Sequence, residues 1–446
     1  MQAARAGNAP MTEHLLAHAH SIGLDIHAVD SKGENALFYA VRSRRPQVVC
    51  ALLDRGLKLC TNSNGVNVVS VSLGLGLDGI VGLVLDRAGD LAEAVCSRDS
   101  KGRTALHHFV EQGDLDMLRR YGCHYRRESD QDLTGCTLLM SACKLSADAR
   151  QMDVVRYLVE VLSVDVNQVD LRRRSALFYA VESGSLAATT YLLQRTERIE
   201  SDSSGLSLLM VAAVTGNHAA AAEIARSKFV HDLLAMVDRN GRNEVHYCAM
   251  HDCVAILDTL VPLRCSVDLR DSHGKTPLMY ACENGRCPTV ACLVRRALAR
   301  VDVYDNDGRN ALHYCFTGTN PSLHCARVLM QKGAEINLRD KGGITPLMLA
   351  CQACAKTHIP LIRFLIEQGA DPIVQDNDGS DAFDYCPFDS EYVKAILRER
   401  TGKRCHCSSG AGMDFPVCDY SSIVLEGNDR FCCFRNSVMY RSDSST

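Results

Sequence analysis

The sequence predicts an all-α solenoid in which a short unit, made of one tight turn and two helices, is repeated along the chain. Three observations predict it: a turn motif recurs at a nearly constant period, helical apolar spacing follows each copy, and one unit is too small to fold alone. With 446 residues, 46% hydrophobic and 23% charged, the composition is that of a folded globular protein. A repeat array explains this length without roughly three separate domains.

The turn motif is Asp-x-x-Gly-x-Thr/Asn/Ser-x-Leu. Eight clear copies lie at residues 30–37, 99–106, 132–139, 202–209, 271–278, 305–312, 340–347 and 376–383. Three weaker copies lie at residues 62–69, 170–177 and 238–245, and Arg173 stands where the second of these should have its glycine. The period averages about 34.6 residues, with steps of 32 to 38. Insertions are therefore tolerated within the unit.

Each part of the unit has a physical reason. The aspartate accepts hydrogen bonds from backbone amides that follow it, and the glycine supplies a positive φ, so a tight turn forms. The Thr, Ser or Asn caps a first helix, which in the unit of Gly274 is predicted over residues 277–284 and ends at Gly285. A second helix follows, with the apolar spacing seen at residues 154–159.

One unit cannot bury enough apolar surface to offset the entropy lost on ordering about 33 residues. Stacking against neighbouring units must supply the rest, which predicts a continuous solenoid.

The unit resembles the ankyrin repeat, which has a period near 33, a turn, and a Thr-Pro-Leu-His-x-Ala-Ala helix that ends at a glycine. Eleven units in register cover residues 30–400, so the resemblance implies an ankyrin-repeat solenoid with short turn or β-hairpin tips. Residues 1–29 match a half repeat, because the chain starts inside a first helix. We expect the natural array to extend upstream or to have been truncated there.

Two kinds of unit alternate. One carries Leu-Met at the start of the first helix, as at Leu278, and the other carries Leu-His or Leu-Phe, as at Leu312. The pair repeats every 69 or 70 residues, which suggests that it was the duplicating unit. Arrays of this kind resemble the large ankyrin-only families of diplomonad protozoa, some of whose relatives carry a NIMA-related kinase domain.

The resemblance implies a scaffold that binds other proteins through the concave face and the turn tips. The two residues between the aspartate and the glycine of each turn are free to vary, and five such pairs are the candidate partner-binding residues: Ser100, Lys101, Arg239, Asn240, Ser272, His273, Asn306, Asp307, Asn377 and Asp378. The alternative for each pair is ordinary solvated turn surface.

Charge and insertions add two weaker hypotheses. The basic residues 172–174 contrast with the acidic tips near 306 and 378, so the partner could carry patterned charge. The insertions at residues 147–153 and 355–360 are predicted to enlarge the connections between two helices and to form contact loops.

Recurring cysteines and histidines are interpreted as structural. Six cysteines take the small Ala position of the first helix and should be buried: Cys143, Cys248, Cys282, Cys315, Cys351 and Cys386. Cysteines at equivalent positions of stacked helices are too far apart for a disulfide. In the ankyrin family the histidine at the positions of His107, His246 and His313 is a hydrogen-bonding residue linked to the turn, so catalysis or metal binding is not expected there.

Residues 401–446 lose the repeat and are predicted to form a disordered tail with free or lipidated thiols. An ordered extension packed on the last repeat and a zinc site are the alternatives. The possible zinc ligands are Cys405, His406, Cys407, Cys418, Cys432 and Cys433. Their spacing matches no standard zinc motif, so we expect neither a metal site nor a cofactor.

Several function classes are disfavoured. The net charge of −4 is too balanced for phosphate-driven nucleic-acid binding. The apolar stretch 68–85 fits a degenerate repeat better than a membrane span, and no signal or transit peptide is evident. No phosphate loop, nucleophile elbow, zinc-protease or kinase motif occurs, so we expect no enzyme activity in this chain.

These observations predict a monomer with a cytoplasmic location, free or associated with the cytoskeleton. Two alternatives to the scaffold remain open: a regulatory array separated from an upstream kinase domain, and a zinc-dependent adaptor that uses the C-terminal cysteines.

Overall fold

The computed structural model describes residues 1–401 except 64, 88–90, 318–320, 354–358 and 388–390. The chain divides into two units, residues 1–401 and residues 402–446. Of the predicted tail 401–446, Thr401 ends helix α25 (Glu391–Thr401), and residues 402–446 lie outside the described residues. Across the described residues the structure is helical, with isolated β-bridges instead of strands. The predicted all-α solenoid is confirmed.

The first helices of the repeats are short and begin just after a Thr, Ser or Asn cap in most units. They are α1 (Gln2–Arg5), α3 (Ala36–Arg42), α5 (Val68–Gly74), α8 (Ala105–Gln112), α10 (Leu138–Cys143), α12 (Ala176–Glu182), α14 (Leu208–Thr215), α17 (Glu244–His251), α19 (Pro277–Glu283), α21 (Ala311–Thr317) and α23 (Pro346–Ala353). The glycines predicted to end them, such as Gly113 and Gly216, have φ values of 69° and 68°. This left-handed conformation suits a helix C-terminus and favours glycine.

The second helices run back beside the first. They are α2 (Ala9–Ala17), α4 (Pro46–Asp54), α6 (Asp78–Asp86), α9 (Leu115–Tyr121), α11 (Ala149–Arg156), α13 (Leu186–Leu193), α15 (His218–Arg226), α18 (Val254–Leu260), α20 (Cys287–Arg295), α22 (Leu323–Gln331), α24 (Ile359–Glu367) and α25 (Glu391–Thr401). Short additional elements lie between repeats: α7 (Leu91–Cys96), η1 (Gly122–His124), η2 (Arg127–Ser129), η3 (Tyr157–Val161), α16 (Val230–Leu234) and η4 (Val261–Leu263).

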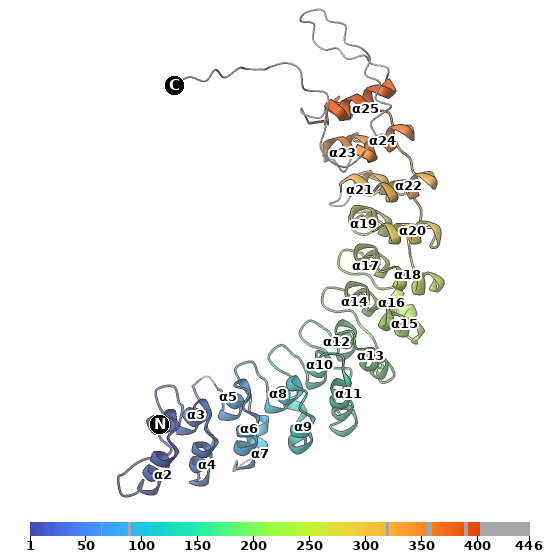
Figure 1. Cartoon of the computed structure of the whole chain (residues 1–446). Coiled ribbons are helices and arrows are strands. Elements are labelled where there is room, and N and C mark those ends of the chain that lie inside the picture. The colour runs from blue at the N-terminus through green and yellow to red at the C-terminus, as the bar shows by residue number, and fades with distance from the viewer. Residues whose placement is uncertain (64, 88–90, 318–320, 354–358, 388–390, 402–446) are drawn as a thin grey trace, which may run out of the picture. The chain divides into compact units, whose positions relative to one another are not determined.

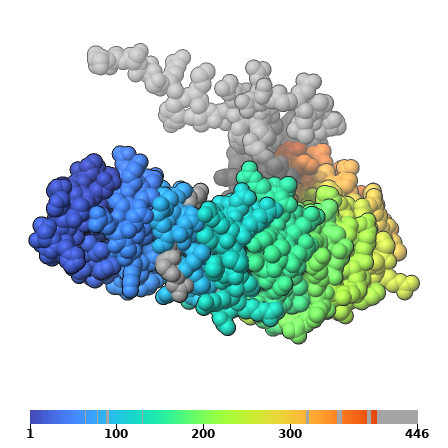
Figure 2. All heavy atoms as spheres, turned by 90° about the horizontal axis from the view of Figure 1, so that it is seen from below, coloured from blue at the N-terminus to red at the C-terminus, as the bar shows by residue number. Residues whose placement is uncertain are grey.

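The helices stack in two rows within residues 1–401. First helices contact the first helices of the next repeat, as α17, α19 and α21 do, and second helices do the same, as α18, α20 and α22 do (Figure 1). In the space-filling view the repeats follow one another in chain order from the N-terminal end, coloured blue, without gaps between neighbours (Figure 2). Apolar side chains between the rows, such as Leu278, Leu293 and Leu312, are fully buried.

The stretch 68–85 forms two short helices, α5 and α6, joined at Gly76, which has a φ of 65°. The interpretation as a degenerate repeat is therefore confirmed. Among the described residues, no helix has the length and apolar character needed to cross a bilayer.

The first predicted contact loop is only partly present, because residues 147 and 148 lie in an enlarged connection between α10 and α11, whereas the rest of the insertion is helical. Residues 149–153 of the first insertion belong to helix α11, because Asp148 caps this helix by accepting a hydrogen bond from the Gln151 amide at 3.0 Å. The buried Gln151 side chain then donates to the backbone oxygens of Cys143 and Leu145, both at 3.1 Å. The insertion lengthens a helix and is anchored to the repeat. Residues 355–358 of the second insertion lie outside the described residues, and Ile359 and Pro360 begin α24.

The unit of Gly379 departs from the pattern, because residues 382–385 form a turn where a first helix is expected. Asp381 replaces the usual cap and accepts a hydrogen bond from the Phe383 amide at 2.9 Å. Pro387 follows and cannot extend a helix, because it lacks an amide hydrogen and disfavours helical geometry in the residue before it.

Candidate partner-binding face

Most of the turns are closed by their own aspartate. In the unit of Gly274, Asp271 Oδ1 accepts hydrogen bonds from the amides of His273 at 2.9 Å and Lys275 at 2.8 Å. The same two bonds, to the second and fourth residues after the aspartate, recur in turns along the array, at Asp30, Asp99, Asp132, Asp170, Asp202, Asp238, Asp305, Asp340 and Asp376. The tips therefore share one backbone conformation.

Neighbouring tips are joined by backbone hydrogen bonds, which we call the tip ladder. The amide of Ser272 donates to the carbonyl of Asn240 at 2.8 Å, and the amide of Asn306 donates to the carbonyl of His273 at 3.0 Å. Equivalent bonds join Ser63 to Lys32, Leu133 to Lys101, Leu171 to Thr134, Ser203 to Arg172, Arg239 to Ser204, Lys341 to Asp307 and Asn377 to Gly342. The ladder holds the tip side chains at regular spacing.

All ten candidate partner-binding residues are exposed at the tips. Two of them also serve the fold: the Asn306 side chain donates to the Ser272 carbonyl at 3.0 Å, and the Asn377 side chain donates to the Lys341 carbonyl at 2.8 Å. His273 has a weak side-chain contact with Ser272 at 3.3 Å. Within the described chain, no side-chain hydrogen bond or ion pair is made by Ser100, Lys101, Arg239, Asn240, Asp307 and Asp378. These six side chains are available to a partner.

Two leucines at the tips are largely exposed, although most tip residues are polar. Leu133 is 67% exposed and Leu171 is 77% exposed, and they occupy consecutive tips of the ladder. Lys101 and Arg172 are exposed on the same stretch. We call Lys101, Leu133, Leu171 and Arg172 the apolar-basic tip segment. The turn motif does not distinguish these leucines from polar tip residues, although an apolar residue between the turn aspartate and glycine marks such a tip in the sequence.

The predicted charge pattern is only partly present. Arg173 adopts a φ of 60° and pairs with Glu200 at 2.7 Å, and Arg174 pairs with Asp170 at 3.3 Å. Of the basic run, Arg172 alone makes no ion pair within the described residues. The acidic tips at 307 and 378 are separated by the tip of Lys341. The apolar-basic tip segment is therefore the more distinctive part of this face.

Beneath many tips, a tyrosine nine residues after the turn aspartate binds it. Tyr247 donates its hydroxyl hydrogen to Asp238 Oδ2 at 2.8 Å, and Arg242 donates to the same oxygen at 2.9 Å. The same tyrosine bond occurs at Tyr39, Tyr179, Tyr280, Tyr314 and Tyr385. Burial works against the charged Asp238 carboxylate, but hydrogen bonds from Arg242 and Tyr247 outweigh it and lower its pKa. Burial and this bond raise the pKa of Tyr247.

The two kinds of repeat use different atoms for one task. His246 Nδ1 accepts a hydrogen bond from the Asn243 amide at 3.2 Å, and its Nε2 donates to the carbonyl of Lys275 in the next repeat at 3.2 Å. In the Leu-Met repeats a methionine sulfur accepts the equivalent amide, as Met279 does from Thr276 at 3.4 Å. Methionine has no hydrogen to donate, so this side-chain bond to the next repeat is specific to histidine.

The structural interpretation of the three histidines is confirmed. Like His246, His107 and His313 accept the amide of the cap residue and donate to a carbonyl of the next repeat. Burial lowers the pKa of each to about 4, so all three are neutral at pH 7. All six cysteines at the Ala position are buried, as expected.

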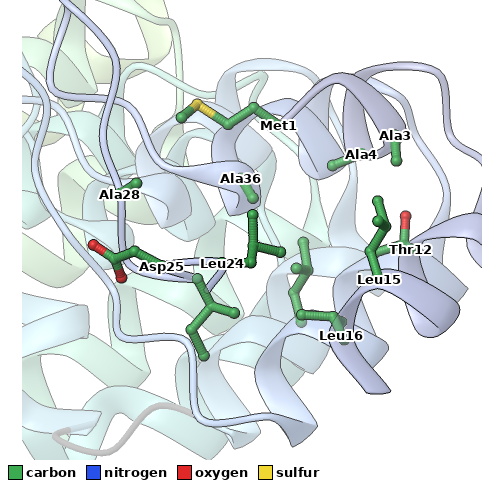
Figure 3. Close-up of a pocket in the computed structure, with 12 residues that line it drawn as sticks. Met1, Ala3, Ala4, Thr12, Leu15, Leu16, Leu24, Asp25, Ala28 and Ala36 are labelled. Atoms are coloured by element: carbon green, nitrogen blue, oxygen red, sulfur yellow. The ribbon is translucent and has the colours of Figure 1, made fainter. Parts of the chain in front are cut away.

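No group of three or more metal-ligating side chains that could hold a metal occurs among the described residues. The cysteines and histidine considered for zinc, from Cys405 to Cys433, lie outside that part of the chain. An open hollow lies near α1 and α2, lined mainly by apolar side chains such as Leu15, Leu16 and Leu24 (Figure 3). Asp25 is the one acidic group in its lining, so no set of reactive groups converges there.

Stacked helical hairpins with ladder-linked tips define a helical-repeat solenoid. The family model described as ankyrin repeats in three copies matches residues 79–170, 147–228, 218–303, 245–340, 289–376 and 318–406. These matches cover most of the chain, so it belongs to the ankyrin-repeat family. Ankyrin repeats are a protein–protein interaction module.

Two curated relatives are similar over short stretches. The E3 ubiquitin-protein ligase KEG of Arabidopsis thaliana is 29% identical over 118 residues, which is 26% of this chain and 7% of that protein. The ankyrin repeat protein nuc-2 of Neurospora crassa is 25% identical over 148 residues, which is 33% of this chain and 13% of that protein. The chain therefore spans only a small part of either relative.

Among solved structures, the ankyrin repeat domain of Bcl-3, a member of the IkappaB protein family, is similar with a TM-score of 0.42 and 24% identity. The match covers 50% of this chain and 97% of that one.

Proposed function

We propose that this chain is a cytoplasmic, monomeric scaffold that binds partner proteins through its turn tips and the adjoining concave face. The observation that supports this most is the tip ladder, which fixes the backbone of consecutive tips while six predicted tip side chains make no bond to the described chain. The backbone of such a surface is already ordered, so it loses little conformational entropy when a partner binds. Its side chains make no bonds that binding would have to break.

The apolar-basic tip segment is the proposed anchor. Leu133 and Leu171 supply exposed apolar surface that would be buried on binding. Lys101 and Arg172 place positive charge beside it. The matching partner surface is an apolar side chain next to aspartate or glutamate. We propose a protein partner of that chemistry.

Site-specific photo-crosslinking in the source cell tests this proposal. A photoreactive amino acid at position 133 or 171 should crosslink to a discrete protein. The matched control is position 186, because Leu186 is 41% exposed and lies in the same repeat as Leu171, but on the second helix α13. Crosslinks from position 186 alone, or to chaperones alone, would refute the tip surface as the binding face.

A binding measurement with the captured partner is the second arm. The double variant Leu133→Asp and Leu171→Asp should weaken affinity about tenfold or more, as expected for an anchor residue pair. Leu186→Asp should leave affinity unchanged. Both variants should keep their helical content, because the replaced side chains are exposed.

A further inference from the structure

Two cysteines of neighbouring repeats place their sulfur atoms next to each other. Cys287 is the first residue of α20, Cys325 is the third residue of α22, and their Sγ atoms are 3.1 Å apart. The two helices pack against each other although the cysteines are 38 positions apart in sequence. The two cysteines occupy different positions within their repeats. The distance between equivalent positions of stacked helices, which is too long for a disulfide, therefore does not apply to this pair.

The two thiols differ in access to solvent. Cys325 is 0% exposed, and burial raises its pKa above the usual value for a thiol. Cys287 is only partly buried, so it is the more accessible of the two residues to a small oxidant. One thiol of the pair is therefore placed to react first, and the other to react with the product.

Ser322 connects both cysteines. Its Oγ accepts a hydrogen bond from the Cys325 amide at 3.4 Å and lies 2.7 Å from Cys287 Sγ. Either the Ser322 hydroxyl or the Cys287 thiol can donate the hydrogen of this second contact. Ser322 therefore touches the sulfur that is the more open to solvent, and the thiolate is the form of a cysteine that attacks an oxidant.

We propose that Cys287 and Cys325 form a peroxide-reactive dithiol, a modification site that links two neighbouring repeats. The Cys287 thiolate attacks one oxygen of hydrogen peroxide, the O–O bond breaks, and hydroxide leaves, which gives a sulfenic acid. The Cys325 sulfur attacks the Cys287 sulfur, an S–S bond forms, and water leaves with the thiol proton. In total, two thiols and one peroxide give one disulfide and two waters.

The disulfide would join α20 to α22 covalently. Opening of one repeat from the next would then be constrained at this interface, while interfaces several repeats away would keep their exchange rates, because coupling in a repeat array acts between neighbours. Oxidation should therefore slow hydrogen exchange in α20 and α22 selectively. Reduction by dithiothreitol should restore the original rates.

Mass spectrometry of the full chain treated with limiting hydrogen peroxide tests the proposal. Free thiols are blocked after the reaction, and peptides are mapped without reduction. We expect a linked peptide pair that contains Cys287 and Cys325 and is about 2 Da lighter than the two free peptides together. The linkage should form before any other among the described cysteines.

Variants separate the two steps. In Cys325→Ala the sulfenic acid on Cys287 should persist and be trapped by dimedone, whereas the wild type should give little adduct. Cys287→Ser should abolish the linkage. Cys253→Ser is the matched control, because Cys253 is also partly buried at the start of a second helix, but its sulfur contacts the Ala213 carbonyl at 3.1 Å. This variant should still form the linkage.

Two results would overturn the proposal. One is an equal dimedone adduct on Cys287 in the wild type and in Cys325→Ala, which would show that Cys325 does not resolve the sulfenic acid. The other is disulfides scattered over the described cysteines at similar rates, which would show that the pair has no special reactivity.

Discussion

Replacing Glu244 by alanine should stabilise the array above pH 7. Glu244 is the first residue of α17 and is 0% exposed, and neither of its carboxyl oxygens has a hydrogen-bond partner within the described residues. The same position holds alanine in several other repeats, as at Ala105, Ala176 and Ala311. Alanine therefore fits the frame, and the substitution leaves no other polar group without its partner.

The magnitude follows from the pKa. Burial raises the pKa of Glu244 from 4.5 to about 7. Between these values the unfolded chain has released the proton while the folded chain retains it, so the stabilising effect of protonation is complete below pH 4.5 and is lost as the pH rises through 7. At about 1.4 kcal/mol for each pH unit, the carboxyl costs about 3 kcal/mol at pH 8.

Hydrogen exchange of the α17 amides, corrected for the intrinsic dependence of exchange on pH, measures the local opening free energy. The difference between Glu244→Ala and the wild type should grow by about 3 kcal/mol between pH 5 and pH 8. Ala311→Glu is the converse control, because Ala311 begins α21 and is 2% exposed, and it should introduce the same pH dependence there. A difference between Glu244→Ala and the wild type that is equal at both pH values would refute a buried, unpaired carboxyl.

Three further predictions concern the frame. Gly274→Ala should lower the thermal stability more than Gly184→Ala does. Both glycines have a positive φ, which costs roughly 1 to 2 kcal/mol for alanine. A Cβ on Gly274 would also lie 2.7 Å from the Asn306 amide nitrogen, whereas a Cβ on Gly184 would meet no atom within 4 Å. Equal losses would refute the tight approach of the tips. His313→Met should lower the free energy of unfolding by about 1 kcal/mol at pH 7, because the hydrogen bond to the Ile344 carbonyl is lost. The difference between the variant and the wild type should shrink at lower pH. Burial lowers the pKa of His313 to about 4, so its stabilising effect is present above pH 6.5 and is lost as the pH falls toward 4; parallel pH profiles of unfolding for variant and wild type would contradict this. Tyr247→Phe should raise the pKa of Asp238, measured by NMR titration, because the hydroxyl bond at 2.8 Å favours the carboxylate, and an unchanged titration would contradict that role.

The sequence was sufficient to predict the features that depend on residues close together in the chain. Asp271, Gly274 and Thr276 specify a turn and a helix cap within six positions, and the structure has both. The buried cysteines and the structural histidines were predicted because each type recurs at one position of the unit in several repeats. Such features are local, so one strong motif determines them.

Features that depend on side-chain contacts outside the repeated motif could not be predicted in this way. Residues 149–153 looked like part of a loop, but Gln151 donates to two carbonyls at the end of α10 and holds them in a helix. The position of His246 holds methionine in alternate repeats. The difference between the two residues is explained only by the structure, in which the imidazole donates to the carbonyl of Lys275 in the next repeat.

The candidate site shows the same limit. The motif places Asn306 and Asn377 in tips, and both are exposed there. The hydrogen bonds from their side-chain amides to the preceding tip join residues that are 34 and 36 positions apart in sequence. The turn motif alone could therefore not assign them a structural role. The exposure of Leu133 and Leu171 likewise depends on what packs beside a tip, which the turn motif does not specify.

Hydrogen-exchange mass spectrometry of the full chain, with and without the partner captured through position 133, tests directly whether the turn tips form the binding face. Binding should slow exchange at consecutive tips around Leu133 and Leu171, while the second helices α11 and α13 of the same repeats keep the exchange rates of the unbound protein. Slowed exchange confined to the second helices, with unchanged tips, would contradict this prediction.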